Sequence, residues 1–237
     1  VEKELIESNA MKDKFFSIIA HDLKNPLAAF KGALQTMTDM YSDMTKEEIF
    51  EFIEAMNSSA KNLFGLLEDL LTWSRSQTGK IQYLPEQQDL SSIVKNTLDV
   101  LSPAAEAKDI ELSSGIPEGT LIYADANMLN LVIRNLVSNS IKFTSKGGTV
   151  HVISRTEENS EIVSVIDSGI GMSEEDQNKL FRLDIAVTTI GTNKEKGTGL
   201  GLILCKDFVE RNGGEISVES KPGKGSTFRF SVPKNRP

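Results

Sequence analysis

Four groups of residues have types and spacings that suit chemistry, and the first of them is centred on His21. Apolar residues in steps of three and four define one face of a predicted helix, and Ile19 and Leu23 belong to that face. At about 100° per residue, His21 then points away from the apolar face and towards solvent. Asp22 follows it, and Asn25 lies one turn further on the same side. An exposed helical histidine is usually a solvated surface residue. The adjacent Asp22 and the helix bend expected at Pro26 make that interpretation less dominant, although a lone His-Asp pair is common by chance.

The second group is a pair of asparagines, Asn135 and Asn139, on an otherwise apolar predicted helix. Being four residues apart, the two amides project from the same helical face. A buried amide without a partner costs about 1 to 3 kcal/mol, so a polar group is expected to meet them. A metal ion with a phosphate would do so, and Lys142 is close enough in the sequence to add positive charge. A satisfied core amide or a helix N-cap is equally compatible with this pattern.

The third group begins with Asp167, which ends a predicted strand and is followed by Gly169 and Gly171. The two glycines allow the backbone to approach another group closely. A carboxylate at this place can accept a hydrogen bond from the exocyclic amine of adenine. Taken by itself, the Asp-x-Gly-x-Gly pattern is as often a turn as a binding site.

The fourth group is glycine-rich and opens a predicted helix, so its backbone amides and the positive helix end suit phosphate. It comprises Gly197, Thr198, Gly199, Leu200 and Gly201. It is not a Walker motif, because no Gly-Lys-Ser/Thr follows, and no strand leads directly into it as in a dinucleotide fingerprint. A flexible hinge is the alternative interpretation.

Two predicted helices must carry the His21 group. Apolar residues recur at helical spacing through residues 16–41 and again through residues 49–70, on either side of a polar turn near residues 42–45. The short turn requires the two helices to run antiparallel. Alone, each helix would leave half of its apolar stripe in water and forgo about 1.5 to 3 kcal/mol per large side chain. We therefore expect the hairpin to pair with a second copy as a dimeric four-helix bundle.

The other three groups lie in a part of the chain whose hydrophobic pattern differs from that of the two helices. After Gly79 and Pro85, helical windows alternate with strand-like runs, which predicts a mixed sheet covered by helices. The expected fold class is α+β, with a helical hairpin at residues 1–78, a linker at 79–89 and an α/β sandwich domain at 90–237. Helices are expected at 90–108, 127–143 and 200–211, and strands at 110–113, 121–123, 149–156, 161–166, 215–219 and 227–232. Residues 184–196 show neither period and form a candidate mobile loop.

Composition argues against several functions. The chain has 237 residues, and its 26 Lys and Arg against 34 Asp and Glu give a net charge of -8 without any basic run, so nucleic acid is not an expected partner. The single cysteine, Cys205, can form neither an internal disulfide nor a multi-cysteine zinc site, and we expect a buried, inert thiol in a cytoplasmic protein. No apolar window approaches the roughly 18 residues of a membrane span.

Taken together, in this order and at these spacings, the groups resemble the catalytic core of bacterial sensor histidine kinases over nearly the whole chain. Residues 16–27 are similar to the histidine box of that family, and residues 135–144 are similar to its asparagine box. Residues 167–171 and 197–201 resemble the two main glycine boxes, and residues 223–228 the last one. The resemblance implies a homodimer whose nucleotide-binding domain lacks a P-loop and carries a mobile lid at 184–196.

The resemblance also implies a reaction. ATP and Mg²⁺ would be the cofactors, with Asn139 as the metal ligand and with Asn135 and Lys142 nearby. Asp22 would be the base that orients His21 for attack on the γ-phosphate. The phosphoryl group would then pass to an aspartate on a response regulator receiver domain, and a polar residue at the position of Asn25 would serve the reverse, phosphatase activity.

The resemblance implies further partners and leaves alternatives open. An upstream sensor domain would be missing from this chain, and the full-length parent protein could be anchored in a membrane. Two departures concern the nucleotide site: Phe143 stands where the family often has tyrosine, and Asp184 follows Phe181 where a second phenylalanine is common, so that Arg182 is the candidate for γ-phosphate contact. A related ATPase, a protein-serine kinase with the same nucleotide fold, and a nucleotide-sensing scaffold without turnover remain as other readings.

Overall fold

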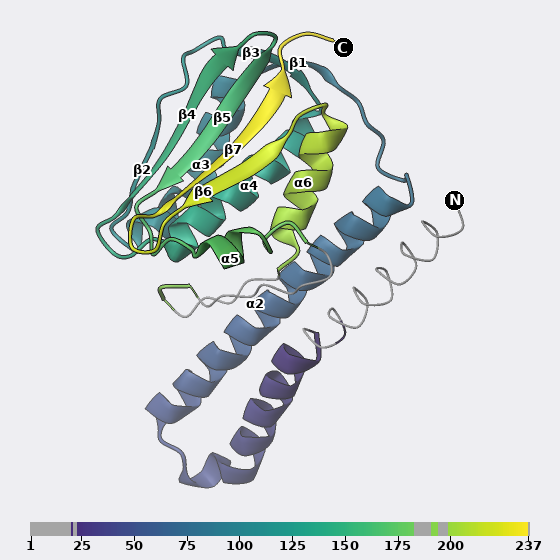
Figure 1. Cartoon of the computed structure of the whole chain (residues 1–237). Coiled ribbons are helices and arrows are strands. Elements are labelled where there is room, and N and C mark those ends of the chain that lie inside the picture. The colour runs from purple at the N-terminus through teal and green to yellow at the C-terminus, as the bar shows by residue number, and fades with distance from the viewer. Residues whose placement is uncertain (1–19, 21–22, 183–190, 194–198, 237) are drawn as a thin grey trace.

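A long helical hairpin is joined to an α/β domain (Figure 1) in the computed structural model of the chain, which describes residues 20, 23–182, 191–193 and 199–236. In its described part the first helix of the hairpin covers residues 23–40. A short 3-10 helix, η1 (Tyr41–Asp43), then leads to α2 (Lys46–Gln77), which returns beside the first helix. The predicted antiparallel hairpin is thus confirmed, with its turn at the polar residues.

A capping box starts α2 directly after the turn. The backbone N–H of Glu48 donates to Thr45 Oγ1 at 3.2 Å, and the N–H of Thr45 donates to Glu48 Oε2 at 2.8 Å. These hydrogen bonds lower the pKa of the Glu48 carboxyl. Because each side chain satisfies an N–H group that the helix cannot use, the chain reverses at this residue and not further along.

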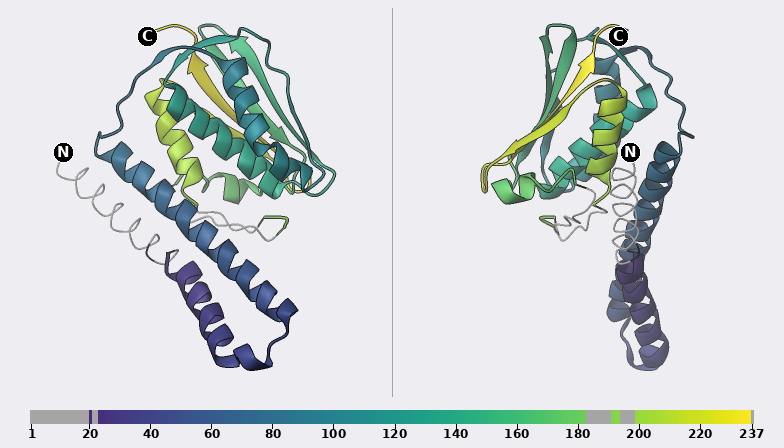
Figure 2. Two further views of the ribbon diagram at one scale, coloured as in Figure 1. Left: turned by 180° about the vertical axis from the view of Figure 1, so that it is seen from behind. Right: turned by 45° about the vertical axis from the view of Figure 1, so that its right-hand side comes forward.

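Five strands form the main sheet of the α/β domain, in the order β2-β4-β5-β7-β6, and β1 pairs with β3 in a separate two-stranded sheet. Among the described strands of this sheet, β2 and β4 pair in parallel and the other neighbours pair antiparallel. Helices α3, α4 and α6 cover one face of the main sheet (Figure 2). The strands are β1 (Glu86–Asp89), β2 (Glu111–Ser114), β3 (Leu121–Ala124), β4 (Thr149–Glu157), β5 (Ser160–Asp167), β6 (Ile216–Ser220) and β7 (Ser226–Pro233). The helices are α3 (Leu90–Glu106), α4 (Ala126–Phe143), α5 (Glu174–Gln177) and α6 (Gly201–Arg211).

The three helices and six strands expected from the sequence all occur, with ends that differ by no more than one or two residues. The linker prediction needs a correction, because residues 86–89 form β1, paired with β3 from Glu86–Ala124 to Asp89–Leu121. This segment, Glu-Gln-Gln-Asp, has no apolar alternation, so only its pairing with β3 makes it a strand. The single-turn helix α5 was not predicted either; Ser173 caps it by accepting from Asp176 N.

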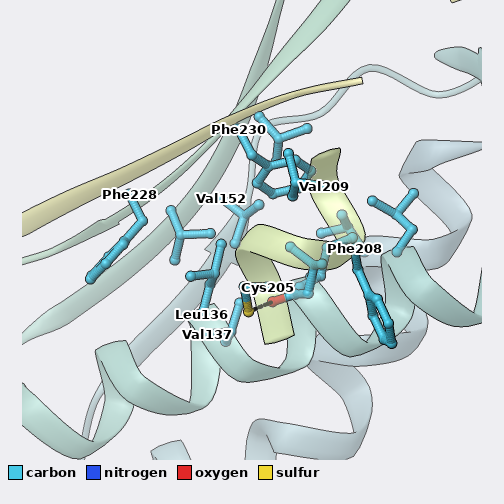
Figure 3. Close-up of a cluster of buried hydrophobic side chains, with 14 of the residues drawn as sticks. Leu136, Val137, Val152, Cys205, Phe208, Val209, Phe228 and Phe230 are labelled. Carbon is cyan, nitrogen blue, oxygen red and sulfur yellow. Dashed lines mark hydrogen bonds between the residues drawn. The ribbon is translucent and has the colours of Figure 1, made fainter. Parts of the chain in front are cut away.

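The core lies between the main sheet and its helices (Figure 3). Alternate residues of the strands point towards the helices, as the period of two requires. Cys205 of α6 is buried there, and burial raises the pKa of its thiol, which confirms the predicted buried thiol. Core residues labelled in Figure 3 are Leu136, Val137, Val152, Cys205, Phe208, Val209, Phe228 and Phe230.

The C-terminal part of α2 lies against α6 and joins the two halves of the chain (Figure 1). Trp73 is buried, and the buried Ser76 donates its hydroxyl to the Asp207 carboxylate. Arg211 donates from Nη2 to the backbone oxygen of Ser76 at 2.7 Å and pairs through Nε with Asp207 Oδ2 at 3.1 Å. The helix that begins at the second glycine box, α6, is therefore held against the hairpin. None of the helices in the described ranges is long and apolar enough to cross a membrane.

Candidate functional site

Asp167 lies at the end of β5 with its side chain oriented by three donors. Its Oδ1 accepts from the backbone N–H of Gly169 at 2.9 Å and from that of Ser226 at 3.1 Å. Its Oδ2 accepts from the Ser140 hydroxyl at 3.3 Å. The residue is only 6% exposed, and burial raises the pKa of its carboxyl although all three hydrogen bonds act to lower it. The result is a fixed, buried hydrogen-bond acceptor of the type that the sequence predicted here.

Gly169 and Gly171 are required by contacts within the protein. A Cβ at Gly169 would lie 2.5 Å from the carbonyl oxygen of Phe143, at the end of α4. Gly171 has a φ of +65°, and a Cβ there would lie 2.0 Å from the carbonyl oxygen of Lys221. Close backbone approach was expected at both positions, and the described contacts are with the polypeptide itself. The first glycine box thereby locks the end of α4 to the turn between β6 and β7.

The last glycine box supports the first one. Residues 223–228 form the turn into β7, and the N–H of Gly223 donates to the carbonyl of Ile170 at 2.7 Å. A Cβ at Gly225 would lie 1.9 Å from the Asp167 carbonyl oxygen, so that only glycine fits beside β5. This packing places the Ser226 N–H where it can donate to the Asp167 side chain.

The asparagine box and the second glycine box meet at the start of α6. Asn135 and Asn139 are both half-buried on α4, and a Cβ at Gly201 would lie 3.0 Å from Asn135 Oδ1. Leu200, which is buried, occupies the N-cap of α6, and no side-chain capping hydrogen bond forms there within the described part of the chain. The positive end of a helix dipole therefore lies next to the Asn135 amide, an arrangement that suits a phosphate group.

Lys142 lies in the last turn of α4, three residues after Asn139. Its Nζ is 4.6 Å from the centre of the Phe143 ring, a cation–π contact. Phe143, which stands where the asparagine box often has tyrosine, thus provides an aromatic face for this lysine. Lys142 is half-buried.

Several predicted residues lie outside the residues that the structure describes. These are His21, Asp22, Gly197, Thr198 and, within the predicted lid, residues 184–190 and 194–196. Asn25 is described and is exposed on the first helix, and Arg182 is exposed after α5. The described residues form two contacts: Asn135 lies against Gly201, and Asp167 bonds to Gly169.

Sequence reasoning missed Ser140 and Ser226, which donate to the two oxygens of Asp167. Ser226 is paired opposite Asp167 in the β5–β7 register, and this partnership could not be inferred from spacing. Ser140 could have been found, because it follows Asn139 and completes the inward face of α4. The Ser140 hydroxyl and the Ser226 backbone N–H hold the carboxylate in place and need not touch a ligand.

A magnesium ion at this site would depend on few protein ligands. No group of three or more His, Cys, Asp or Glu side chains able to hold a metal occurs among the described residues. Asn139 would contribute an amide oxygen, and Mg²⁺ in nucleotide sites commonly takes one or two protein oxygens together with phosphates and water. The residues present therefore fit a metal that arrives with a nucleotide better than one bound by the protein alone.

Comparison with known families divides the chain as the fold does. Residues 11–79 match the His Kinase A (phospho-acceptor) domain, HisKA. Residues 124–236 match the histidine kinase-, DNA gyrase B- and HSP90-like ATPases, HATPase_c. The hairpin thus matches a phosphoacceptor domain, and most of the α/β domain matches an ATPase domain.

Individual proteins agree with this division. The sensor protein GacS of Pseudomonas syringae pv. syringae is 34% identical over 242 residues, which cover 99% of this chain and 26% of GacS, so the chain spans about a quarter of that relative. The histidine kinase AdeS of Acinetobacter baumannii has a similar fold, with a TM-score of 0.72 at 21% identity over 91% of this chain and 98% of that one. The histidine kinase ThkA, solved in complex with the response regulator protein TrrA, also has a similar fold. Its TM-score is 0.79 at 20% identity, and the match covers 99% of this chain and 65% of ThkA. With a phosphoacceptor domain followed by this ATPase domain, the chain belongs to the sensor histidine kinases, of which it is a catalytic core.

Proposed function

We propose that the chain is an ATP-dependent protein-histidine kinase that phosphorylates its own His21 and passes the phosphoryl group to an aspartate of a response regulator receiver domain. The observation that most supports this proposal is the buried carboxylate of Asp167, which lies beside α4 as a hydrogen-bond acceptor. Its domain is joined to the hairpin whose sequence contains His21. An aspartate held by three donors can accept a hydrogen bond from the adenine amine without reorganising. The reverse, phosphatase activity towards the regulator is part of the proposal.

The proposed transfer needs a nucleophile, a base and a nucleotide site. A ring nitrogen of His21 attacks the γ-phosphorus, the bond from that phosphorus to the β,γ-bridging oxygen breaks, and ADP leaves. The carboxylate of Asp22 accepts the proton of the imidazole and keeps the attacking nitrogen nucleophilic. When bound, Mg²⁺ would neutralise charge on the phosphate oxygens. Asn139 would hold it, while Asn135 and the N-terminus of α6 would lie against the phosphates.

Labelled ATP tests the proposal against its alternatives. Incubation of the chain with Mg²⁺ and γ-labelled ATP should give a phosphoprotein that is labile in acid and stable in base, as expected for phosphohistidine. A base-labile, acid-stable product would indicate a protein-serine kinase, and release of phosphate without phosphoprotein would indicate an ATPase. Binding of ATP without either product would indicate a nucleotide-sensing scaffold.

We further propose that the hairpin forms a homodimer. Members of the two predicted apolar stripes remain exposed on it, so about half of each stripe lies in water as expected for one copy alone. They are Leu27, Leu34, Tyr41, Ile53 and Leu67. Sedimentation equilibrium should give twice the chain mass of 26.0 kDa. A monomer at micromolar concentration would contradict the four-helix bundle.

The solved complex of ThkA with TrrA supports a response regulator as the second partner. That protein shares the fold of this chain over 99% of its length, so a receiver domain has a comparable hairpin to approach here. Asn25, exposed on the first helix and one turn from His21 in sequence, would face such a partner.

Replacing Asn139 by alanine is expected to weaken ATP binding about tenfold in the presence of Mg²⁺ and to change it little without the metal. The substitution removes an amide oxygen that only the metal would use. Isothermal titration calorimetry with and without Mg²⁺ measures both affinities. Asn130→Ala is the matched control, since Asn130 is exposed on the same helix and its side chain bonds to Ala126 O at 2.8 Å and to the Thr97 hydroxyl of α3 at 3.5 Å. Equal losses of ATP affinity with and without Mg²⁺ in Asn139→Ala would show that Asn139 is not a metal ligand.

The forward and reverse activities are expected to separate at Asn25 and Asp22. An amide can orient water for attack on a phospho-aspartate but cannot act as a base. Asn25→Ala should therefore keep phosphorylation of His21 within about threefold and lose most phosphatase activity, whereas Asp22→Ala should lose kinase activity by about 10²-fold. The kinase rate is measured with ATP and Mg²⁺, and the phosphatase rate with a purified phosphorylated cognate regulator in the presence of ADP.

The control for this pair is Gln35→Ala, which removes an exposed amide of the same helix that bonds to Asp39. It should leave both rates at the wild-type value. Equal losses of kinase and phosphatase activity in Asn25→Ala would show that Asn25 supports the helix only, and the division of labour would be abandoned.

A further inference from the structure

The C-terminal end of α4 is a junction of four chain segments. The last four carbonyl groups of a helix have no partner within it and must find one elsewhere. Here Ser140 O accepts from Thr144 N at 3.0 Å, and Phe143 O accepts from Ile170 N of the first glycine box at 3.1 Å. The two carbonyls between them, of Ile141 and Lys142, accept from the side chain of Lys108.

Lys108 follows α3 and is only 6% exposed, which is rare for a lysine. Its Nζ donates to Ile141 O at 2.8 Å, to Lys142 O at 3.1 Å and to Thr192 Oγ1 at 2.7 Å. An ammonium has three N–H donors and no acceptor, so it can donate to each of these oxygens. The negative end of the α4 dipole further stabilises the buried charge. These partners, which come from α4 and from the segment 191–193, indicate a fixed cation that holds several segments together.

Thr192 belongs to the short described segment 191–193 and is attached to the same helix end. Its N–H donates to Lys142 O at 3.1 Å, and its hydroxyl lies 2.9 Å from Thr144 O and 3.1 Å from Lys142 O, to either of which it can donate. The oxygen of that hydroxyl meanwhile accepts from Lys108. Backbone and side chain of Thr192 are therefore held beside the turn of α4 that carries Lys142 and follows Asn139.

We propose that Lys108 is a positioning residue for the nucleotide site, acting through Thr192 and the last turn of α4. The inference rests on the proposed function, because it assumes that Asn139 and Lys142 face a nucleotide. Lys108 itself is bound to two helix carbonyls and a hydroxyl, and it acts by holding the helix end and Thr192 in one relative position. Loss of the ammonium would leave two buried carbonyls without this donor and would release Thr192 from one of its attachments. Asn139 and Lys142 would then no longer be presented in one arrangement.

Lys108→Met tests the inference, because methionine keeps most of the length and apolar volume of the side chain and removes the donor. Thr192→Val removes the hydroxyl at the other end of the contact and keeps the branched shape. Each variant is expected to bind ADP and Mg·ATP about tenfold more weakly than wild type, the size expected for a lost hydrogen bond to a charged group. The double variant should bind nucleotide no more weakly than the weaker single variant, since both substitutions break the Lys108–Thr192 contact through which the effect is proposed to act. Affinities are measured calorimetrically on the whole chain.

A kinetic readout separates positioning from general loss of stability. Both variants should raise the KM for ATP about tenfold and leave the phosphorylation rate at saturating ATP within about threefold of wild type. Lys108→Arg, which keeps the charge and the donors, should recover part of the lost affinity. Lys146→Met is the matched control, because Lys146 lies in the neighbouring turn and pairs with Asp109 at 3.0 Å while its side chain is 80% exposed. It should bind nucleotide as wild type does.

Wild-type nucleotide affinity in folded Lys108→Met, or losses that add in the double variant, would overturn the inference. If Lys108→Met fails to fold, Thr192→Val decides: wild-type affinity in that variant would equally overturn it. A wild-type chain that binds no adenine nucleotide would instead refute the proposed function, and the positioning role with it. The two kinds of failure are distinguishable, because the variant results that overturn the role of Lys108 still leave a wild-type chain that binds adenine nucleotide.

Discussion

His21→Gln is expected to abolish phosphoprotein formation, to below about 1% of the wild-type level, while ATP affinity remains unchanged. Glutamine is polar and of similar size but has no nucleophilic ring nitrogen. The proposed nucleotide site is built from α4, β5 and the start of α6, none of which contains His21. Incorporation of label from γ-labelled ATP gives the first quantity, and calorimetric titration gives the second.

The second histidine of the chain provides the matched control. His151 lies on β4, and its Nδ1 is 2.7 Å from the hydroxyl of Ser113 on the neighbouring strand β2. It has a local structural partner and lies in the ATPase domain, so His151→Gln should be labelled as strongly as wild type. Full acid-labile labelling of His21→Gln would show that another residue is the phosphoacceptor.

Asp167→Asn is expected to weaken ATP and ADP equally, by about 10- to 100-fold, because both nucleotides carry the same base. A hydrogen bond to a charged group contributes about 1.5 to 3 kcal/mol, and an amide NH₂ turned to the adenine amine would set donor against donor. The fold should tolerate the change, since Asn can accept from Gly169 N and Ser226 N through its oxygen and donate to Ser140. Unchanged affinity for both nucleotides would remove Asp167 from the adenine site.

The pH dependence of binding distinguishes a carboxylate from a merely polar contact. Burial raises the pKa of Asp167, so its carboxyl takes up a proton at a higher pH than the roughly 3.9 of an exposed aspartate. Once protonated, it loses acceptor strength, and ADP affinity should fall as the pH drops through that raised pKa. Asp167→Asn should lack this component, whereas the titration of ADP itself affects both proteins alike. Parallel pH profiles for the two proteins would contradict the assignment.

The raised pKa of Asp167 affects folding stability in the opposite pH direction from nucleotide binding. A carboxyl whose pKa is higher in the folded than in the unfolded state makes the fold bind its proton more tightly. Stability from this group is therefore lost as the pH rises through the raised pKa, and the ionised Asp167 lowers stability at neutral pH. Asn carries no charge, so Asp167→Asn should melt no lower than wild type near neutral pH. Such a result would show that lost binding is not lost folding.

The sequence by itself determined the elements and the order of the motifs. The antiparallel hairpin followed from apolar steps of three and four around a polar turn, and the strands from alternation, which are properties of neighbouring residues. The positions of Asp167 at a strand end and of Gly201 at a helix start could be predicted for the same reason. The strand β1 could not be predicted, because its polar residues become a strand only when β3 supplies the partner.

Only the tertiary structure decided which residues hold the site together. Ser226 is 59 positions from Asp167, Ser140 is 27 from it, and Thr192 is 84 from Lys108. These partners meet because strand register and helix packing bring them together, and no local pattern specifies either. Lys108 carries no motif in the sequence; its burial arises because the free carbonyls at the end of α4 provide the hydrogen bonds that a buried ammonium requires.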